Sequence, residues 1–91
     1  MAKVSVRMFA TVREAAGRSE LKVEADDLAH LLRLLGKSRG PRLSKLLSQL
    51  SSGPDRLVVL VNGRNIGRTP HKDVELSDGD EVAIFPPVSG G

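Results

Sequence analysis

Residues 19–35 read SELKVEADDLAHLLRLL, and within this stretch the hydrophobic period changes. Leu21 and Val23 alternate with charged residues, which is the period of a strand buried on one face. A stripe of leucines then follows at the i, i+3, i+4 and i+7 spacing of one helix face: Leu28, Leu31, Leu32 and Leu35. The change of period predicts a strand followed by an amphipathic helix.

The helical pattern continues beyond the first stripe. Asp26 or Asp27 is a suitable N-cap, and Gly36 is placed to end the helix as its C′ residue. Pro41 fits the first turn of a second helix, where the missing N–H is not needed. Four more leucines repeat the stripe: Leu43, Leu46, Leu47 and Leu50. The pattern predicts one main helix and a second, shorter helix.

Apolar alternation elsewhere predicts the remaining strands. Residues 3–9 alternate, and residues 10–17 form a turn or short helical piece before an antiparallel strand over 19–25. Residues 57–61 are almost entirely apolar, as in a strand buried on both faces. Residues 74–77 form a short edge piece and residues 82–85 a last strand. The fold class is therefore an α+β roll with a mixed sheet of four to five strands against a helical layer, an arrangement whose best-known example is the ubiquitin-like β-grasp.

The composition excludes several classes of function. A chain of 91 residues without cysteine is a single domain with no thiolate nucleophile, disulfide or cysteine-bound zinc. Two histidines, His30 and His71, do not make a His-rich site, so we expect no metal and no catalytic side chain. Two phenylalanines are too few for a protein that stacks bases, which argues against nucleic acid. Without a bilayer-length apolar run or a signal-peptide pattern, we expect a cytoplasmic protein that does not bind membranes.

The chain ends in FPPVSGG, residues 85–91. Pro86 and Pro87 stop the last strand, because proline cannot donate to a ladder and restricts the residue before it. Gly90 and Gly91 carry no side chain, so they can pass through a narrow channel with the carboxylate uncovered. We therefore divide the chain into a domain over 1–85 and an extended tail over 86–91. The alternative is that the two glycines are only a frayed end.

The tail also resembles a known family. The stretch DGDEVAIFPPVSGG, residues 78–91, is similar to the C-terminus of the MoaD family, the small sulfur-carrier subunit of molybdopterin synthase. Residues 9–14, FATVRE, and residues 59–63, VLVNG, resemble other parts of that family. This superfamily also includes ThiS and archaeal ubiquitin-like modifiers.

The resemblance implies the ubiquitin-like β-grasp fold, an activity and a site. An E1-like enzyme would use ATP to adenylate the Gly91 carboxylate, and sulfur from a sulfurtransferase would convert it into a thiocarboxylate. That tail would enter the large subunit of molybdopterin synthase and donate sulfur for the dithiolene of molybdopterin or tungstopterin. Gly90 would give clearance, no cofactor would be bound, and the catalytic side chains would belong to the partner.

The resemblance further implies a partner interface around the tail: Phe85, Pro86, Pro87, Val88, Ser89 and Arg13. Two of these residues have an alternative, purely structural role. Phe85 can be a core residue at a strand end, and Arg13 can be a solvated loop residue. The stretch 29–54 carries five cations and no acid, which is either a solvated helix face or a basic patch for an acidic partner or RNA.

Three other functions remain open. The first is a ubiquitin-like modifier that joins Gly91 to lysines of target proteins, with or without sulfur transfer. The second is a thiamine-pathway sulfur carrier, although such carriers are shorter and lack the Phe-Pro-Pro sequence. The third is a β-grasp RNA- or protein-binding module that ends in two glycines by coincidence.

Overall fold

The computed structural model describes residues 1–49 and 56–87. The first half comprises strand β1 (Ala2–Met8), helix α1 (Ala10–Ala16), strand β2 (Glu20–Ala25) and helices α2 (Leu28–Arg39) and α3 (Pro41–Gln49). The second half comprises strands β3 (Val58–Val61) and β4 (Arg64–Asn65), the 3-10 helix η1 (His71–Asp73) and strand β5 (Glu81–Phe85). None of the helices in these two described ranges has the length and apolar character needed to cross a membrane.

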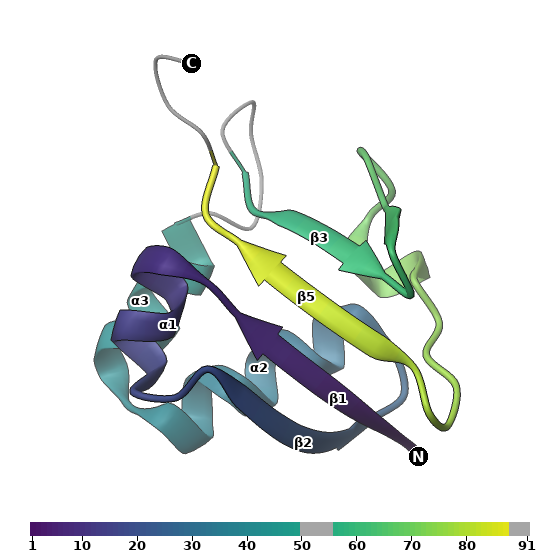
Figure 1. Ribbon diagram of the computed structural model, residues 1–91, viewed down its shortest axis with the longest axis horizontal. Coiled ribbons are helices and arrows are strands. Elements are labelled where there is room, and N and C mark those ends of the chain that lie inside the picture. The colour runs from purple at the N-terminus through teal and green to yellow at the C-terminus, as the bar shows by residue number, and fades with distance from the viewer. Residues whose placement is uncertain (50–55, 88–91) are drawn as a thin grey trace.

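The strands form one mixed sheet in the order β2-β1-β5-β3-β4, shown in Figure 1. β1 pairs with β2 in an antiparallel register, Val4 opposite Val23. β1 also pairs with β5 in parallel, Val6 beside Val82, although the two strands lie at opposite ends of the described chain. β3 is antiparallel to β5 and to β4. The predicted α+β class and mixed sheet of four to five strands are confirmed, and the sheet has five strands.

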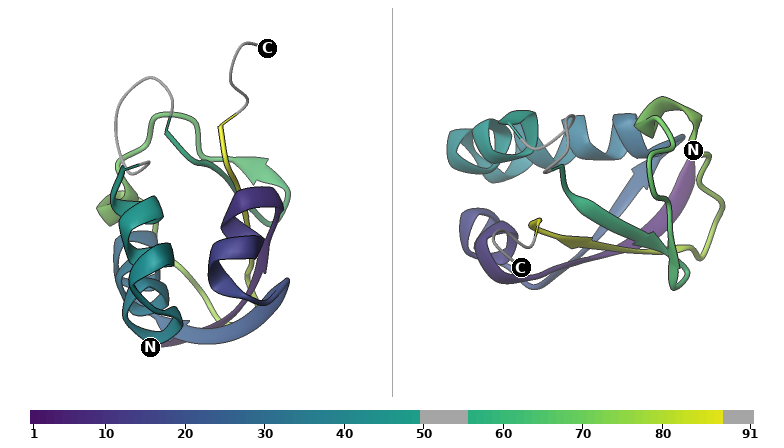
Figure 2. Two further views of the ribbon diagram at one scale, coloured as in Figure 1. Left: turned by 90° about the vertical axis from the view of Figure 1, so that its left-hand side faces the viewer. Right: turned by 90° about the horizontal axis from the view of Figure 1, so that it is seen from above.

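The helices form a layer on one face of the sheet only. The two views of Figure 2 show α2 and α3 together on one side of the strands, with α1 at the end of the sheet. The space between the layers is filled by aliphatic side chains, and no polar or charged residue of the described ranges is buried. Val6, Leu31, Val59 and Ile84 are each 0% exposed. The opposite face, toward the viewer in Figure 1, has no helix over it.

Helix α2 begins where the sequence predicts but ends later. Asp27 is the N-cap, and its Oδ1 accepts a hydrogen bond of 2.7 Å from the His30 backbone N–H. The prediction that Gly36 ends this helix is wrong, because α2 continues to Arg39 and Gly40 follows it. Gly36 is buried inside the helix, and a Cβ built there would lie 3.3 Å from three atoms of Ser44. Glycine thus lets α3 approach α2 closely.

Two predictions about the strands also need correction. β3 is not buried on both faces, because Leu57 and Val59 are buried while Val58 and Leu60 are only half-buried. The short edge strand over 74–77 is absent; Glu75 makes one isolated bridge to Asp27. The edge strand is instead Arg64–Asn65, which the Asn62-Gly63 turn folds back onto β3. A strand of two residues is too short to show any period.

The predicted helical piece before β2 is α1, which ends as expected at Gly17. This glycine adopts a left-handed conformation with φ 77°, and its N–H donates to the Arg13 carbonyl. The Arg39 Nε also donates a 3.0 Å hydrogen bond to the Ala16 carbonyl. This bond joins the last turn of α2 to the last turn of α1. Leu50, the last member of the second leucine stripe, lies outside the described residues.

Candidate functional site

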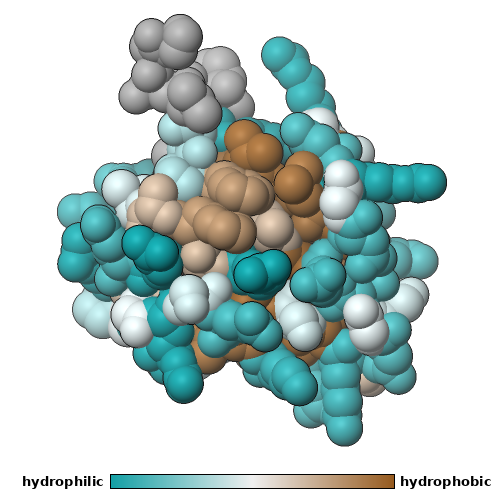
Figure 3. All heavy atoms as spheres, viewed as in Figure 1, coloured by the Kyte–Doolittle hydropathy of each residue, from teal (hydrophilic) through white to brown (hydrophobic). Residues whose placement is uncertain are grey.

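An apolar patch lies on the open face of the sheet, next to the point where β5 ends. Because Val82 and Ile84 point into the core, the pleat places Ala83 and Phe85 on the opposite face. The β3 register brings Val58 beside Phe85 and Leu60 beside Ala83. The space-filling view in Figure 3 shows this apolar surface surrounded by hydrophilic residues. We call the set the open-face patch: Phe9, Val58, Leu60, Ala83 and Phe85.

The two phenylalanines of the chain lie against each other in this patch. Their rings are stacked, with centroids 4.3 Å apart and planes within 6° of parallel. The Phe9 N–H donates a 3.2 Å hydrogen bond to the Ile84 carbonyl, which places Phe9 beside the end of β5. Such pairs contribute about 0.5–1.5 kcal/mol beyond the area they bury. Stacking therefore holds two large, half-buried apolar side chains at the surface in a fixed arrangement.

The start of β5 is fixed by a network around Asn62. Its Oδ1 accepts from the Glu81 N–H at 2.9 Å, and its Nδ2 donates to Asp80 Oδ1 at 2.9 Å. Asp80 Oδ2 in turn accepts from the Ser77 N–H at 2.8 Å. Asn62 can take its left-handed backbone conformation, φ 52°, because asparagine tolerates that region better than most residues. The Asn-Gly turn thus sets the register of β5, and with it the positions of Ala83 and Phe85.

The structure locates only part of the predicted tail interface. Phe85 is half-buried on the open face, so it is not an ordinary core residue, and Pro86 and Pro87 follow it half-buried and outside any strand. Arg13 is exposed in the last turn of α1, and its N–H donates to the Phe9 carbonyl. Val88, Ser89, Gly90 and Gly91 lie outside the described residues.

The sequence analysis missed four members of the patch: Phe9, Val58, Leu60 and Ala83. Two signals could have found them. Phe9 is one of only two aromatic residues, and residues 57–61 are more apolar than a strand with a single covered face needs. An apolar residue on an uncovered face is typical of a binding surface rather than of the core.

The fold and this face define a ubiquitin-like β-grasp protein. The sequence matches the ThiS family over residues 6–91, and the chain belongs to that family. This result confirms the resemblance to the MoaD and ThiS sulfur carriers.

Relatives support the same grouping. A molybdopterin synthase sulfur carrier subunit of Chlamydomonas reinhardtii is 35% identical over 91 residues, which cover 98% of this chain and 99% of that protein. The solution structure of small archaeal modifier protein 1 from Methanosarcina acetivorans is 35% identical, has a TM-score of 0.81, and covers 100% of this chain and 98% of its own. A third match is a chain in the complex of subunits 1 and 2 of molybdopterin-converting factor from Helicobacter pylori. It is 25% identical with a TM-score of 0.64, and the match covers 98% of this chain and 99% of that chain.

Proposed function

We propose that this protein is a sulfur carrier whose Gly91 carboxylate becomes a thiocarboxylate for the synthesis of molybdopterin or tungstopterin. In this proposal residues 1–85 are the folded carrier domain and residues 86–91 are the tail that enters partner sites. The observation that carries it is the continuity between Phe85 and the tail: the same residue ends β5, belongs to the open-face patch and leads into Pro86. A partner that covers the patch would meet the tail as it leaves the sheet.

The chemistry belongs to the main chain. A carboxylate resists nucleophiles because its negative charge is delocalised and repels them, so it needs activation. Attack of the Gly91 carboxylate on the α-phosphate of ATP, in an E1-like partner, would release pyrophosphate and form an acyl-adenylate. A sulfur nucleophile at the oxidation level of sulfide, supplied by a sulfurtransferase, would then add to the acyl carbon and expel AMP. The product is the thiocarboxylate.

We assign no catalytic side chain to this protein in that sequence. It holds no cysteine, so its sulfur would be carried on Gly91, while ATP would be used by the activating partner. Gly90 would let the tail pass through a narrow channel without side-chain clashes. The large synthase subunit would provide the groups that move sulfur to the pterin.

The open-face patch is the surface on which we expect the large subunit and the activating enzyme to dock. Aromatic residues at the centre of an interface commonly supply most of its binding energy, since they bury large areas with little loss of conformational freedom. The stacked Phe9 and Phe85 are already fixed in the free protein, which lowers the cost of ordering them on binding. Arg13, Val88 and Ser89 would lie at the margin of this interface.

The decisive experiment is intact-mass spectrometry of the full chain after incubation with ATP, an E1-like enzyme of a molybdopterin pathway and sulfide. We expect a mass increase that corresponds to replacement of one oxygen by sulfur. A variant lacking Gly91 is the control and should keep its original mass. An unmodified full-length chain under conditions that modify a known carrier would contradict the proposal.

A second function, a modifier joined through Gly91 to lysines, is favoured by the similarity to small archaeal modifier protein 1. It predicts high-mass adducts of the tagged protein in a cell lysate. Deletion of Gly91 should abolish the adducts, and adducts that survive the deletion would refute conjugation through this residue.

A further inference from the structure

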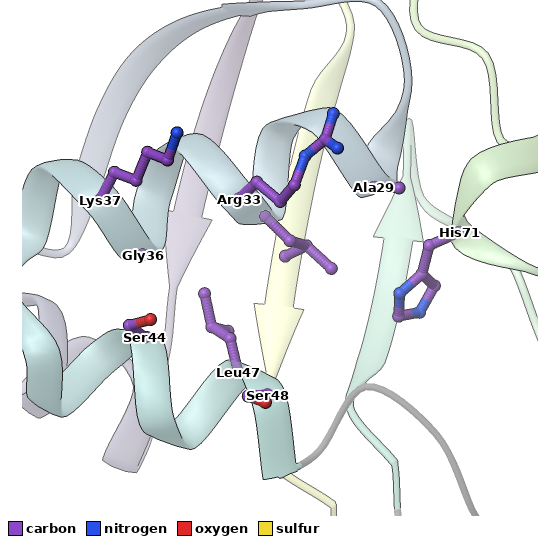
Figure 4. A pocket seen from close by; sticks show the side chains of 9 residues that line it. Ala29, Arg33, Gly36, Lys37, Ser44, Leu47, Ser48 and His71 are labelled. Atoms are coloured by element: carbon purple, nitrogen blue, oxygen red, sulfur yellow. The ribbon is translucent and has the colours of Figure 1, made fainter.

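A groove on the helical layer provides a concave surface that is formed by different residues from the open-face patch. It lies between α2 and α3, has a volume of about 380 Å³, and is seen from close by in Figure 4. Leu32, Gly36 and Leu47 form its apolar floor, and Leu47 projects from α3 into the space between the helices. At Gly36 the two helices meet, because a Cβ there would lie 3.3 Å from Ser44.

Two cations border this groove along α2. Arg33 and Lys37 are one helical turn apart and exposed, and Figure 4 shows both side chains extending away from α3. Neither forms an ion pair with a carboxylate of residues 1–49 or 56–87. The sequence from 28 to 54 holds five cations and no acid, whereas the whole chain has a net charge of only +3. The positive charge is therefore concentrated on the helical layer, and the remainder of the chain is net acidic.

The groove is closed at one end by His71, the first residue of η1 (Figure 4). Its Nε2 is buried and has no hydrogen-bond partner among the described residues. Burial and the nearby Arg56 guanidinium both lower the pKa of His71, so the imidazole is neutral at neutral pH. A buried polar nitrogen without a partner is uncommon, because leaving it unpaired costs free energy. Because no solvent reaches this nitrogen, a bound segment would contact the imidazole at the end of the groove rather than Nε2 itself.

We propose that this groove, with its apolar floor, its border of Arg33 and Lys37 and the His71 imidazole at its end, docks an acidic, amphipathic peptide segment of a partner protein. Apolar side chains of the segment would lie on Leu32 and Leu47, and its carboxylates would meet the two cations along α2. The site is independent of the proposed sulfur chemistry, because it uses neither the tail nor the open-face patch. A partner could therefore hold the carrier from this side while the tail is engaged elsewhere.

Other occupants fit these features less well. A free phosphate group needs donors that converge, but Arg33 and Lys37 extend along the outside of α2 and the floor is apolar. A single-stranded RNA needs aromatic surfaces for its bases. Both phenylalanines lie on the open face, and the groove offers only the half-buried imidazole of His71.

The test is an NMR titration of the ¹⁵N-labelled full chain with a short synthetic peptide in which leucines at helical spacing are flanked by glutamates. We expect saturable shifts in α2, α3 and η1 below about 1 mM peptide, with the open-face patch unaffected. Peptides with lysine in place of glutamate, or alanine in place of leucine, should each bind much more weakly. They separate the electrostatic from the apolar contribution.

The matched variants exchange equal charge at two places. Arg33→Glu/Lys37→Glu should weaken peptide binding roughly tenfold or more, because it replaces two attractive charges by repulsive ones. Lys3→Glu/Lys22→Glu changes the same net charge on the exposed, polar part of the sheet and should leave binding within about twofold. Both pairs are exposed, so thermal unfolding should show that both variants fold.

Four outcomes would overturn the proposal. They are an absence of saturable shifts, shifts confined to the open-face patch, equal weakening in both charge variants, or groove shifts produced by oligouridine rather than by the acidic peptide. A fifth is a concentration-dependent shift of the same groove residues without peptide, which would make a second copy of this chain the occupant. Thiocarboxylate formation on Arg33→Glu/Lys37→Glu distinguishes this failure from failure of the proposed function, because the variant keeps Gly91.

Discussion

The same strands build the covered and the open face of the sheet, but the two faces differ in how deeply their apolar side chains are buried. On the covered face, Val6, Val59 and Ile84 are 0% exposed and pack under the helices. On the open face, their immediate neighbours include Ala83 and Phe85, which are apolar yet half-buried. In a small domain each apolar side chain is needed for the core. Large apolar side chains kept outside it are therefore available for a partner.

The largest effect should follow from breaking the covered face within β5. Ile84→Ala removes a fully buried side chain and should lower the free energy of unfolding by about 2–5 kcal/mol. Urea denaturation followed by circular dichroism measures it. Ala83→Ser, one residue earlier on the open face, is the control and should change stability by less than about 1 kcal/mol. Equal losses at both positions would mean that the open face is part of the core.

Breaking the open face should affect binding more than stability. Phe85→Ala removes half of the stacked pair, and we expect it to weaken binding of a molybdopterin synthase large subunit by about 2 kcal/mol or more. The expected loss of folding stability is smaller than that of Ile84→Ala, because Phe85 is only half-buried. Calorimetric titration gives the affinity. Lys45→Ala on α3 is the control, and an unchanged affinity for Phe85→Ala would remove the patch from the interface.

The next prediction tests how closely helices α2 and α3 pack against each other. Gly36→Val places a branched side chain where even a Cβ would lie 3.3 Å from Ser44, so we expect a loss of about 1–3 kcal/mol. Thermal denaturation measures the loss. Ser38→Val, at an exposed position of the same helix, controls for the helix propensity of valine and should change stability by less than about 0.5 kcal/mol. Equal losses would show that α2 and α3 have room to separate.

The smallest expected effect is a change of folding stability with pH that depends on His71, at the end of the α2–α3 groove. Because the pKa of His71 is lowered from its usual 6.5, the unfolded chain takes up a proton there before the folded chain does. The wild type should therefore lose stability, relative to His71→Gln, as the pH falls through 6.5, and the difference should level off below the folded-state pKa. Melting temperatures between pH 8 and pH 4 test this sign. A wild type that gains stability on acidification would reverse it.

The hydrophobic period and the turn residues predict most of the fold, and the errors have physical causes. The leucine spacing predicts α2 and α3, but it also predicts a helix end at Gly36, because glycine commonly ends a helix. Its actual role, close approach to Ser44, depends on a contact that no periodicity reveals. β4 was missed for a related reason, because two residues carry no pattern and their pairing depends on the Asn62-Gly63 turn.

The site was predicted less completely than the fold. Phe85 was expected near the tail from a family resemblance, yet its partner Phe9 is separated from it by most of the chain. Only the parallel pairing of β1 with β5 brings the two rings together. For the α2–α3 groove the sequence predicts only the run of cations over 29–54. The positions of Leu47 and His71 depend on how three separate elements pack.

The central position of β5 also governs when this protein can fold. The strand lies between β1 and β3, so a nascent chain that has not yet released residues 81–85 from the ribosome has its sheet in two unconnected pieces. Contacts between strands so distant in sequence form late and slowly. The segment that completes the sheet is also the one that leads into Pro86 and the tail. A chain whose core is unfinished therefore also lacks a completed segment 86–91, so the proposed activation of Gly91 would act only on molecules that are able to fold.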